Sequence, residues 1–210
     1  MLAEALQVPG SRDWLLDRKI VPNQVGLGLV DSTRSYLETL TSTSCIPNGS
    51  KIWWDVRPHW QYPTLEFRVC DVCTRVDEAV CIGAILQAII AKLWKLRRDN
   101  MTFRVYPQTL IEENKWRAAR FGLDGKLIDF GKQIDLPARA LIREMIEWFI
   151  DDVVDDLGSR KEVEYAFRIL DEGTSADRQL ATYQRTGNFQ AVVDQLIRET
   201  EEGVRSASPS

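Results

Sequence analysis

Histidine and cysteine are scarce in this chain, with one histidine and four cysteines among 210 residues. A hydrolase of the serine or cysteine type needs a base beside its nucleophile, and a zinc site needs several nitrogen or sulfur ligands, so a single histidine argues against both. Four cysteines are also too sparse for a disulfide framework in a chain of this size. We therefore expect reduced thiols and a cytoplasmic protein.

An excess of one charge and a long apolar run are also missing. Twenty-seven basic and 31 acidic residues leave a formal net charge of −4, which provides no basic field for nucleic acid or an anionic membrane. The longest apolar stretch, 79–94, is interrupted by Gln87 and Lys92 and is shorter than the roughly 20 residues that span a bilayer. Residues 1–10 lack the features of a secretory signal. We expect neither a nucleic-acid partner nor a membrane segment.

The remaining composition, 44% hydrophobic and 28% charged, is that of a globular protein. Two segments rich in β-forming residues, 51–57 and 64–70, predict a hairpin with a six-residue connection. Residues 1–30 remain unassigned and 204–210 are expected to be disordered. Helical spacing begins near Ser32 and stops before Pro47. Further helices are predicted at 76–98, 107–121, 137–156, 160–171, 175–186 and 188–202, with a turn and a short strand at 122–131. The predicted class is α+β.

The polar face of the predicted hairpin is the most informative feature. Alternation places Asp55 and Arg57 on one face of the first strand, and Glu66 and Arg68 on one face of the second. A carboxylate that binds Mg²⁺ beside a guanidinium that binds phosphate suits phosphoryl transfer. The alternative is an ordinary surface patch of ion pairs. If Asp55 faced Glu66, their repulsion would require a metal or an arginine between them.

A second group of polar residues follows helical spacing. Asn114, Arg117 and Arg120 stand at i, i+3 and i+6 and can share one helix face. They can bind an ATP phosphate or a substrate carboxylate, because arginine suits planar anions. The alternative is a buried structural network of ion pairs with Asp124 or Asp129.

Asp177 and Arg178 present the same choice between a functional and a structural role. Thr174 and Asp177 have the spacing of a capping box, which is the plainer account of Asp177. Cys70 and Cys73 have redox spacing but follow a strand, so they are predicted to be structural. His59 is predicted to be a solvated side chain in a loop.

The acidic run at 151–156 offers a rival hypothesis. Its spacing resembles the diphosphate–Mg²⁺ motif of isoprenoid synthases. The run lies at a predicted helix C-terminus, where the helix dipole disfavours carboxylates, and a second acidic motif is missing. A solvated acidic helix end is the preferred interpretation.

Three motifs resemble the carboxylate-amine ligase family related to glutamate-cysteine ligase, of the GCS2 type. They are KIWWDVRP at 51–58 followed by PTLEFRVCD at 63–71, NKWRAARFGLDG at 114–125, and TSADRQ at 174–179. The motifs stand in the family's order, and the likeness runs from about residue 32 to residue 200. Within the family, the chain looks closest to the cyanobacterial-type glutamate-cysteine ligases.

The resemblance implies a glutamine-synthetase-like catalytic domain with ATP and Mg²⁺ as cofactors. In such a ligase ATP phosphorylates the γ-carboxylate of glutamate, and the amine of cysteine or another acceptor displaces the phosphate, a reaction of glutathione biosynthesis. By motif, Glu66 resembles the metal ligand and Arg68 the catalytic arginine that stabilises the transferred phosphate. The nucleotide- and substrate-binding residues are expected to be Arg57, Asn114, Arg117 and Arg120.

The chain departs from the family in one large respect. The family's first half supplies a Glu-x-Glu strand that completes the metal site, and no such motif occurs here in a strand-like context. Residues 31–203 therefore look like a C-terminal half, and we expect little or no activity from the chain alone, since one strand cannot fill the roughly six positions of Mg²⁺. Its expected partners are the small-molecule substrates and either a second copy or a complementing N-terminal half. The alternative is a non-catalytic remnant or subunit that binds a partner through an exposed sheet edge.

Overall fold

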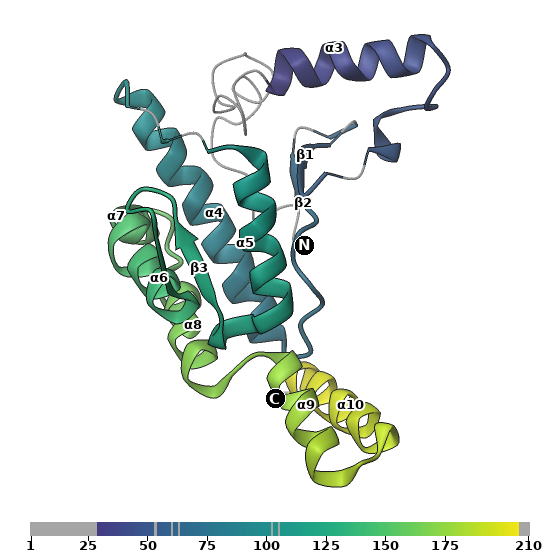
Figure 1. Ribbon diagram of the computed structural model, residues 1–210, viewed down its shortest axis with the longest axis vertical. Helices are drawn as coiled ribbons and strands as arrows, with labels where there is room; N and C mark the ends of the chain where they lie inside the picture. The colour runs from purple at the N-terminus through teal and green to yellow at the C-terminus, as the bar shows by residue number, and fades with distance from the viewer. Residues whose placement is uncertain are drawn as a thin grey trace. The chain divides into compact units, whose positions relative to one another are not determined.

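The computed structural model describes residues 29–205 except for 53, 60, 63, 102 and 105 (Figure 1). The chain divides into two compact units, Met1–Asp71 with Leu93–Tyr106, and Val72–Lys92 with Pro107–Ser210. The described part is mostly helical and holds two small antiparallel sheets, in keeping with the α+β class. The relation to a glutamine-synthetase-like domain stays a prediction. The interpretations of residues 1–28 and of the tail 206–210 lie outside the described residues.

The first unit contains a short β-hairpin. Helix α3 (Leu29–Ser42) and a 3₁₀ turn, η1 (Gly49–Lys51), precede strands β1 (Val56–Pro58) and β2 (Leu65–Phe67). The strands pair antiparallel. Both are shorter than predicted, and the connection runs over six residues, 59–64. The predicted hairpin is confirmed, with its regular pairing confined to the residues nearest the turn.

The connection between the two strands is ordered by His59. Its Nδ1 accepts hydrogen bonds from the backbone nitrogens of Gln61 (3.1 Å) and Tyr62 (3.0 Å). The imidazole also stacks on the Tyr62 ring, with centroids 4.9 Å apart. The prediction of a merely solvated side chain is wrong, because the imidazole takes up two backbone donors that the turn leaves without strand partners.

The second unit is built on the first part of helix α4 (Val76–Arg98), whose predicted bounds are confirmed. Acidic residues in its first turn and basic residues in its last turn complement the helix dipole. Cys81 and Ala88 are buried in the core, and Ala84, Ile85 and Ile89 pack around them. Among the described helices, α4 alone is long and apolar enough to cross a membrane. Length and composition are weak evidence for this, because a helix packed into a protein core passes the same test.

Helix α5 (Gln108–Phe121) leads through a 3₁₀ turn, η2 (Gly122–Asp124), into a second hairpin. Strand β3 (Lys126–Asp129) pairs antiparallel with β4 (Ile134–Pro137). The sequence does not predict strand β4, because its last residue, Pro137, is assigned to the start of the following helix. The Asp129 carboxylate forms the turn by accepting hydrogen bonds from the backbone nitrogens of Gly131 and Lys132, both at 2.9 Å.

The predicted single helix at 137–156 is wrong. Helix α6 (Ala138–Glu144) passes into a π-helical turn, η3 (Met145–Phe149), followed by α7 (Asp151–Val154). The wide turn is closed by a hydrogen bond from the Ile150 backbone nitrogen to the Met145 carbonyl (3.1 Å). Ile146, Ile150, Val153 and Val154 all reach the core, where they meet Val163 and Ala166. A turn of this kind cannot be read from apolar spacing, because it changes the spacing itself.

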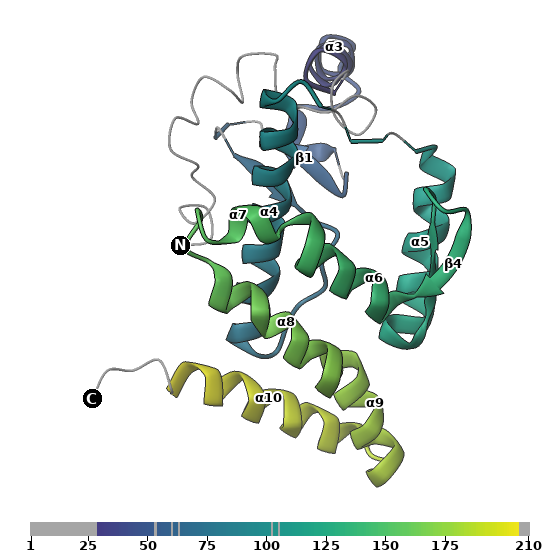
Figure 2. The same ribbon diagram turned by 90° about the vertical axis from the view of Figure 1, so that its left-hand side faces the viewer.

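Helices α8 (Arg160–Glu172), α9 (Ser175–Thr186) and α10 (Phe189–Arg205) follow closely the predicted ranges. The Thr174 side chain accepts a hydrogen bond from the Asp177 backbone nitrogen, and the Asp177 carboxylate accepts one from that of Thr174, which confirms the capping box. Gly187 ends α9 with a positive φ of 61°, a conformation that costs glycine little. Helices α9 and α10 lie side by side as an antiparallel pair (Figure 2).

Arg178 of α9 joins three parts of the second unit through charges. Its guanidinium contacts Glu78 of α4 (Nη1 to Oε1, 2.7 Å) and Glu199 of α10 (Nε to Oε1, 3.0 Å). The exposed fractions of the three side chains are only 13%, 5% and 11%. Thr74 also donates to Glu199 (2.6 Å). Buried charges are tolerated only when paired and hydrogen-bonded, which this arrangement provides.

Burial and hydrogen bonding act in opposite directions on Glu199. Burial alone would raise the pKa of its carboxyl, but hydrogen bonds from Arg178, Thr74 and Gln195 outweigh it and lower the pKa from 4.5 to about 2. For Arg178, burial would lower the pKa, and the bonds to Glu78 and Glu199 raise it instead. Glu199 and Arg178 therefore both stay charged at neutral pH.

Replacing Arg178 should destabilise the second unit strongly. Arg178→Met leaves two carboxylates buried without a cation, and we expect a loss of about 3–5 kcal/mol in the free energy of unfolding. Urea unfolding followed by circular dichroism measures this loss. The control is Arg168→Met, which removes an exposed pair with Glu172 and should leave the unfolding midpoint nearly unchanged. Equal midpoints for the two variants would contradict the structural role of Arg178.

The stability of this unit should fall in acid because of Glu199. A carboxyl whose pKa is lower in the folded state stabilises the fold above its unfolded pKa, and this contribution is lost as the pH falls. With a pKa of about 2 against 4.5, the loss of up to about 3 kcal/mol should develop below pH 4.5. The measurement is the free energy of unfolding from pH 6 to pH 3, for the parent and for Glu199→Gln. The variant should show a flatter profile, and identical slopes would refute the assignment.

Candidate functional site

The first candidate site is the polar face of the β1–β2 hairpin. Strand pairing sets Arg57 directly opposite Glu66, and the Arg57 Nε donates to the Glu66 Oε2 at 2.7 Å. The Arg68 Nη1 donates to the Glu66 Oε1, also at 2.7 Å. The backbone nitrogen of Arg68 donates to the Asp55 carbonyl (2.7 Å). Asp55 therefore faces Arg68 rather than Glu66, and the like-charge pairing considered from the sequence does not occur.

Arg57 is a buried residue of this face and forms hydrogen bonds to the local backbone. Only 10% of its side chain is exposed. Its Nη1 donates to the carbonyls of Gly49 (3.3 Å), Ser50 (3.0 Å) and Ile52. Arg57 thus fastens the η1 turn to the hairpin, which accounts for its burial, while its role in anion binding stays a prediction.

Glu66 is held as a carboxylate between two guanidiniums. Hydrogen bonds from Arg57 and Arg68 lower the pKa of Glu66 below its usual range. Both carboxylate oxygens already accept from a guanidinium, whose positive charge opposes the approach of a cation. In the described part of the chain, no group of three or more histidine, cysteine, aspartate or glutamate side chains could hold a metal ion. Since Mg²⁺ takes about six oxygen ligands, these residues by themselves do not fit a magnesium site.

The second group of predicted site residues lies on α5, in the other unit. The Asn114 side chain donates to the Ile128 carbonyl (2.9 Å) and accepts from the Ile128 backbone nitrogen (2.7 Å). Asn114 therefore acts like an additional strand partner for β3. The Arg120 guanidinium lies over the Phe121 ring, 5.4 Å from its centroid.

Arg117 pairs with an acid of its own helix, and with neither of the two aspartates considered from the sequence. Its Nε donates to the Glu113 Oε1 at 2.8 Å. Asp124 pairs with Arg139 (2.9 Å) and Asp129 with Lys132 (3.2 Å). The alternative interpretation, an ion-pair network of these arginines with Asp124 or Asp129, is therefore wrong, because Asp124 pairs with a residue of α6 and Asp129 with a residue of the turn between β3 and β4.

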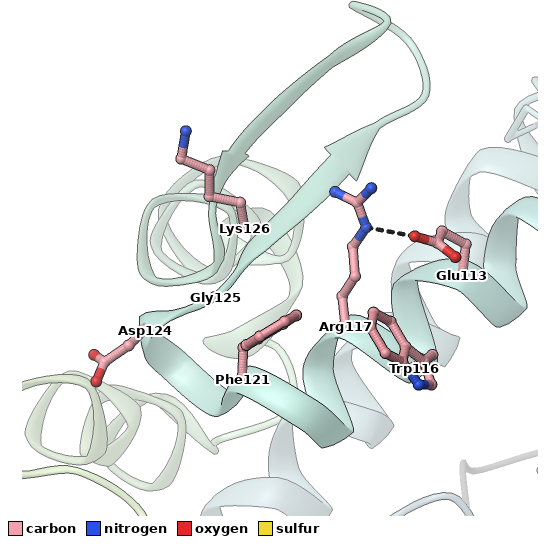
Figure 3. A pocket seen from close by; sticks show the side chains of 7 residues that line it. All are labelled: Glu113, Trp116, Arg117, Phe121, Asp124, Gly125 and Lys126. Carbon is pink, nitrogen blue, oxygen red and sulfur yellow. Dashed lines mark hydrogen bonds and ion pairs between the residues drawn. The ribbon is translucent and has the colours of Figure 1, made fainter.

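A pocket of about 390 Å³ opens beside Arg117 (Figure 3). Glu113, Trp116 and Arg117 reach it from α5, and Phe121 lies at the end of that helix. The rim is completed by Asp124, Gly125 and Lys126. The Trp116 and Phe121 rings meet edge to face, with centroids 5.7 Å apart. Of the predicted site residues, only Arg117 lines this pocket.

The sequence interpretation missed Glu113, Trp116 and Phe121. Glu113 and Arg117 carry the i, i+4 spacing of a helical ion pair, which was a usable signal. Glu199 was also missed, although it follows Val192 by seven residues and so lies on the inner face of α10. The sequence pattern singles out its partner Arg178, but not the two glutamates that surround this arginine.

The acidic run at 151–156 forms ion pairs with basic side chains of the described residues. Asp151 and Asp155 pair with Arg160, and Asp152 pairs with Lys92 (2.8 Å). The acidic run is thus exposed but ion-paired, rather than simply solvated. All four cysteines are free, and burial raises the pKa of the Cys81 thiol to about 12.

The contacts of Asn114 predict a defined loss of stability. Asn114→Ala leaves the nitrogen and carbonyl of Ile128 without their side-chain partner, and we expect a cost of about 1–3 kcal/mol in the free energy of unfolding. Glu112→Gln, at an exposed position of the same helix, should change it very little. Hydrogen exchange at the Ile128 amide provides a local readout, and unchanged protection in Asn114→Ala would contradict the assignment.

The chain is similar to known proteins over most of its length. The model of glutamate-cysteine ligase family 2 (GCS2) matches residues 24–195. A protein of Herpetosiphon aurantiacus is 56% identical over 183 residues, which make up 84% of this chain and 47% of that protein. One of Chloroflexus aggregans is 57% identical over 169 residues, 80% of this chain and 43% of that protein. Both carry the name "Putative glutamate--cysteine ligase 2".

The chain spans about half the length of the curated relatives it matches. The matched residues include both hairpins, the motif on α5 and the capping box of α9. The resemblance stated from the sequence motifs is thereby confirmed. The chain belongs to glutamate-cysteine ligase family 2.

Proposed function

We propose that this chain forms part of an ATP- and Mg²⁺-dependent ligase that joins glutamate to cysteine through a γ-glutamyl phosphate. The observation that carries the proposal is the family match over residues 24–195, which includes the hairpin with Glu66 between two arginines. The names of the relatives support the same reaction class.

Arg68 is the residue of this chain best suited to the proposed chemistry. Its side chain is 35% exposed, against 10% for Arg57, so it can meet a ligand while Glu66 holds one of its terminal nitrogens. A guanidinium fixed in this way stabilises negative charge that develops on phosphoryl oxygens, at little cost in reorganisation. Glu66 therefore acts as a positioning residue for Arg68. Magnesium, where the whole ligase uses it, needs oxygen ligands beyond those of this hairpin.

The activity is proposed for a protein larger than this chain. Because the chain spans about half of each relative, we expect the rest of the site to come from residues outside it, and we propose a complementing N-terminal half or a second copy as the partner. The chain by itself should be inactive or weakly active. A cytoplasmic location and a place in glutathione biosynthesis belong to the same proposal.

Complementation tests the proposed function. The chain is mixed with ATP, Mg²⁺, glutamate and cysteine, with and without the remaining part of the Herpetosiphon relative supplied as a separate polypeptide. ADP and γ-glutamylcysteine should form in the complemented mixture only. Absence of product from two folded, associated parts would contradict the proposal, and rapid turnover by the chain alone would contradict its incompleteness.

Variants of the hairpin then assign the residues. In the complemented enzyme, Arg68→Gln should lower kcat about a hundredfold or more, as expected for the loss of a fixed donor to developing charge. Glu66→Ala should also abolish most of the turnover and leave the fold intact. Arg98→Gln, a control at an exposed helix end, should retain full activity. Unchanged kcat in Glu66→Ala would remove Glu66 from the site.

A further inference from the structure

The pocket beside α5 has a lining that differs from that of a phosphate site. Its volume of about 390 Å³ lies within the range of small-molecule pockets, roughly 300–1,000 Å³. Two acids, Glu113 and Asp124, balance two cations, Arg117 and Lys126, so the lining carries no net charge. The other large side chains are the aromatic rings of Trp116 and Phe121. Such a lining does not favour a multiply charged phosphate, which would meet a carboxylate beside each cation.

The charges at the rim already have partners outside the pocket. Asp124 pairs with Arg139 at 2.9 Å, and Lys126 pairs with Asp135 at 3.4 Å. In Figure 3 both side chains point away from Arg117. The charges left to meet a ligand are therefore those of the Glu113–Arg117 pair.

The geometry of this pair leaves complementary atoms for a ligand. The Glu113 Oε1 accepts from the Arg117 Nε, and Figure 3 shows the terminal nitrogens of Arg117 directed away from this bond. No hydrogen bond joins those terminal nitrogens, or the Glu113 Oε2, to another described residue of the chain. The arginine side chain is 29% exposed and that of the glutamate 44%. A half-buried guanidinium with two parallel donors suits a planar carboxylate, and the adjacent carboxylate oxygen suits an ammonium group.

We propose that the pocket lined by Glu113, Arg117, Trp116 and Phe121 binds an α-amino acid with an uncharged side chain. The ligand carboxylate accepts from the terminal nitrogens of Arg117, and its ammonium donates to Glu113. Its side chain lies against the rings of Phe121 and Trp116. An acidic side chain is disfavoured, because a second carboxylate would lie near Glu113 without a cation of its own.

The inference adds a binding site to the proposed function. A catalytic role for this site rests on that function. In the proposed ligase the pocket would hold the acceptor, which is the amino acid whose amine becomes joined to glutamate, and not glutamate itself. Binding itself requires neither ATP nor turnover. If the chain binds the amino acid but shows no ligase activity in the complemented mixture, the binding proposal holds and the proposed function is wrong. If the complemented mixture is active but the chain does not bind the amino acid, the proposed function holds and the binding proposal is wrong.

Titration calorimetry of the full chain with L-leucine, without nucleotide, tests the proposal. N-acetyl-L-leucine lacks the ammonium and L-leucinamide lacks the carboxylate, and each should bind at least about tenfold more weakly, as expected for the loss of a charged hydrogen bond. L-glutamate should also bind more weakly than L-leucine. Inorganic phosphate should not compete with L-leucine.

Protein variants locate the binding. Arg117→Gln and Glu113→Gln should each raise the Kd for L-leucine about tenfold or more. Arg143→Gln is a matched control, since Arg143 also forms an i, i+4 pair with a glutamate and lies over an aromatic ring, and its Kd should equal that of the parent. A thermal melt checks that each variant is folded. The proposal is overturned if the parent shows no saturable binding of L-leucine, if L-glutamate or phosphate binds more tightly, or if folded Arg117→Gln keeps the parental Kd.

Discussion

One guanidinium between two buried carboxylates holds the second unit together. Arg178 meets Glu78 at the start of α4 and Glu199 on α10, while its own helix begins at the Thr174–Asp177 capping box. The apolar core lies elsewhere in the unit, around Ile150, Val154 and Val163. Helices α9 and α10 thus meet the start of α4 through a charged contact that is nearly closed to water. Such a contact specifies one arrangement, because any shift of a helix leaves a charge unpaired in a low-dielectric surrounding.

The same chemistry recurs on the β1–β2 hairpin with a different outcome. There Glu66 lies between Arg57 and Arg68, and exposure decides what each arginine does. Arg57 is buried and donates hydrogen bonds to backbone carbonyls, so it stabilises the hairpin. Arg68 is more exposed to solvent, and in the proposed function it is the residue that meets the phosphoryl group. The two arginines of this hairpin therefore differ in role: Arg57 stabilises the local structure, and Arg68 is the candidate catalytic residue.

The hairpin lies within the part of the chain that matches glutamate-cysteine ligase family 2. The described residues offer Glu66 but no cluster of further acidic ligands. The chain spans about half of each relative, so a magnesium site in the proposed ligase would take its further oxygen ligands from residues outside this chain. The pocket beside α5 needs no such completion, because all of its lining comes from residues 113–126.

Elements whose signals are local can be predicted from the residues alone. The bounds of α4 and α9, the capping box at Thr174 and the hairpin at Glu66 were all predicted, because helix spacing, caps and strand alternation act over a few residues. The family followed from three short motifs. Which charged side chains pair with each other depends on the folded arrangement. Arg117 pairs with Glu113 and not with Asp124, and Arg178 finds Glu78 a hundred residues away. Long side chains reach several candidate partners, and the choice among them is made by packing and burial, which no local pattern records.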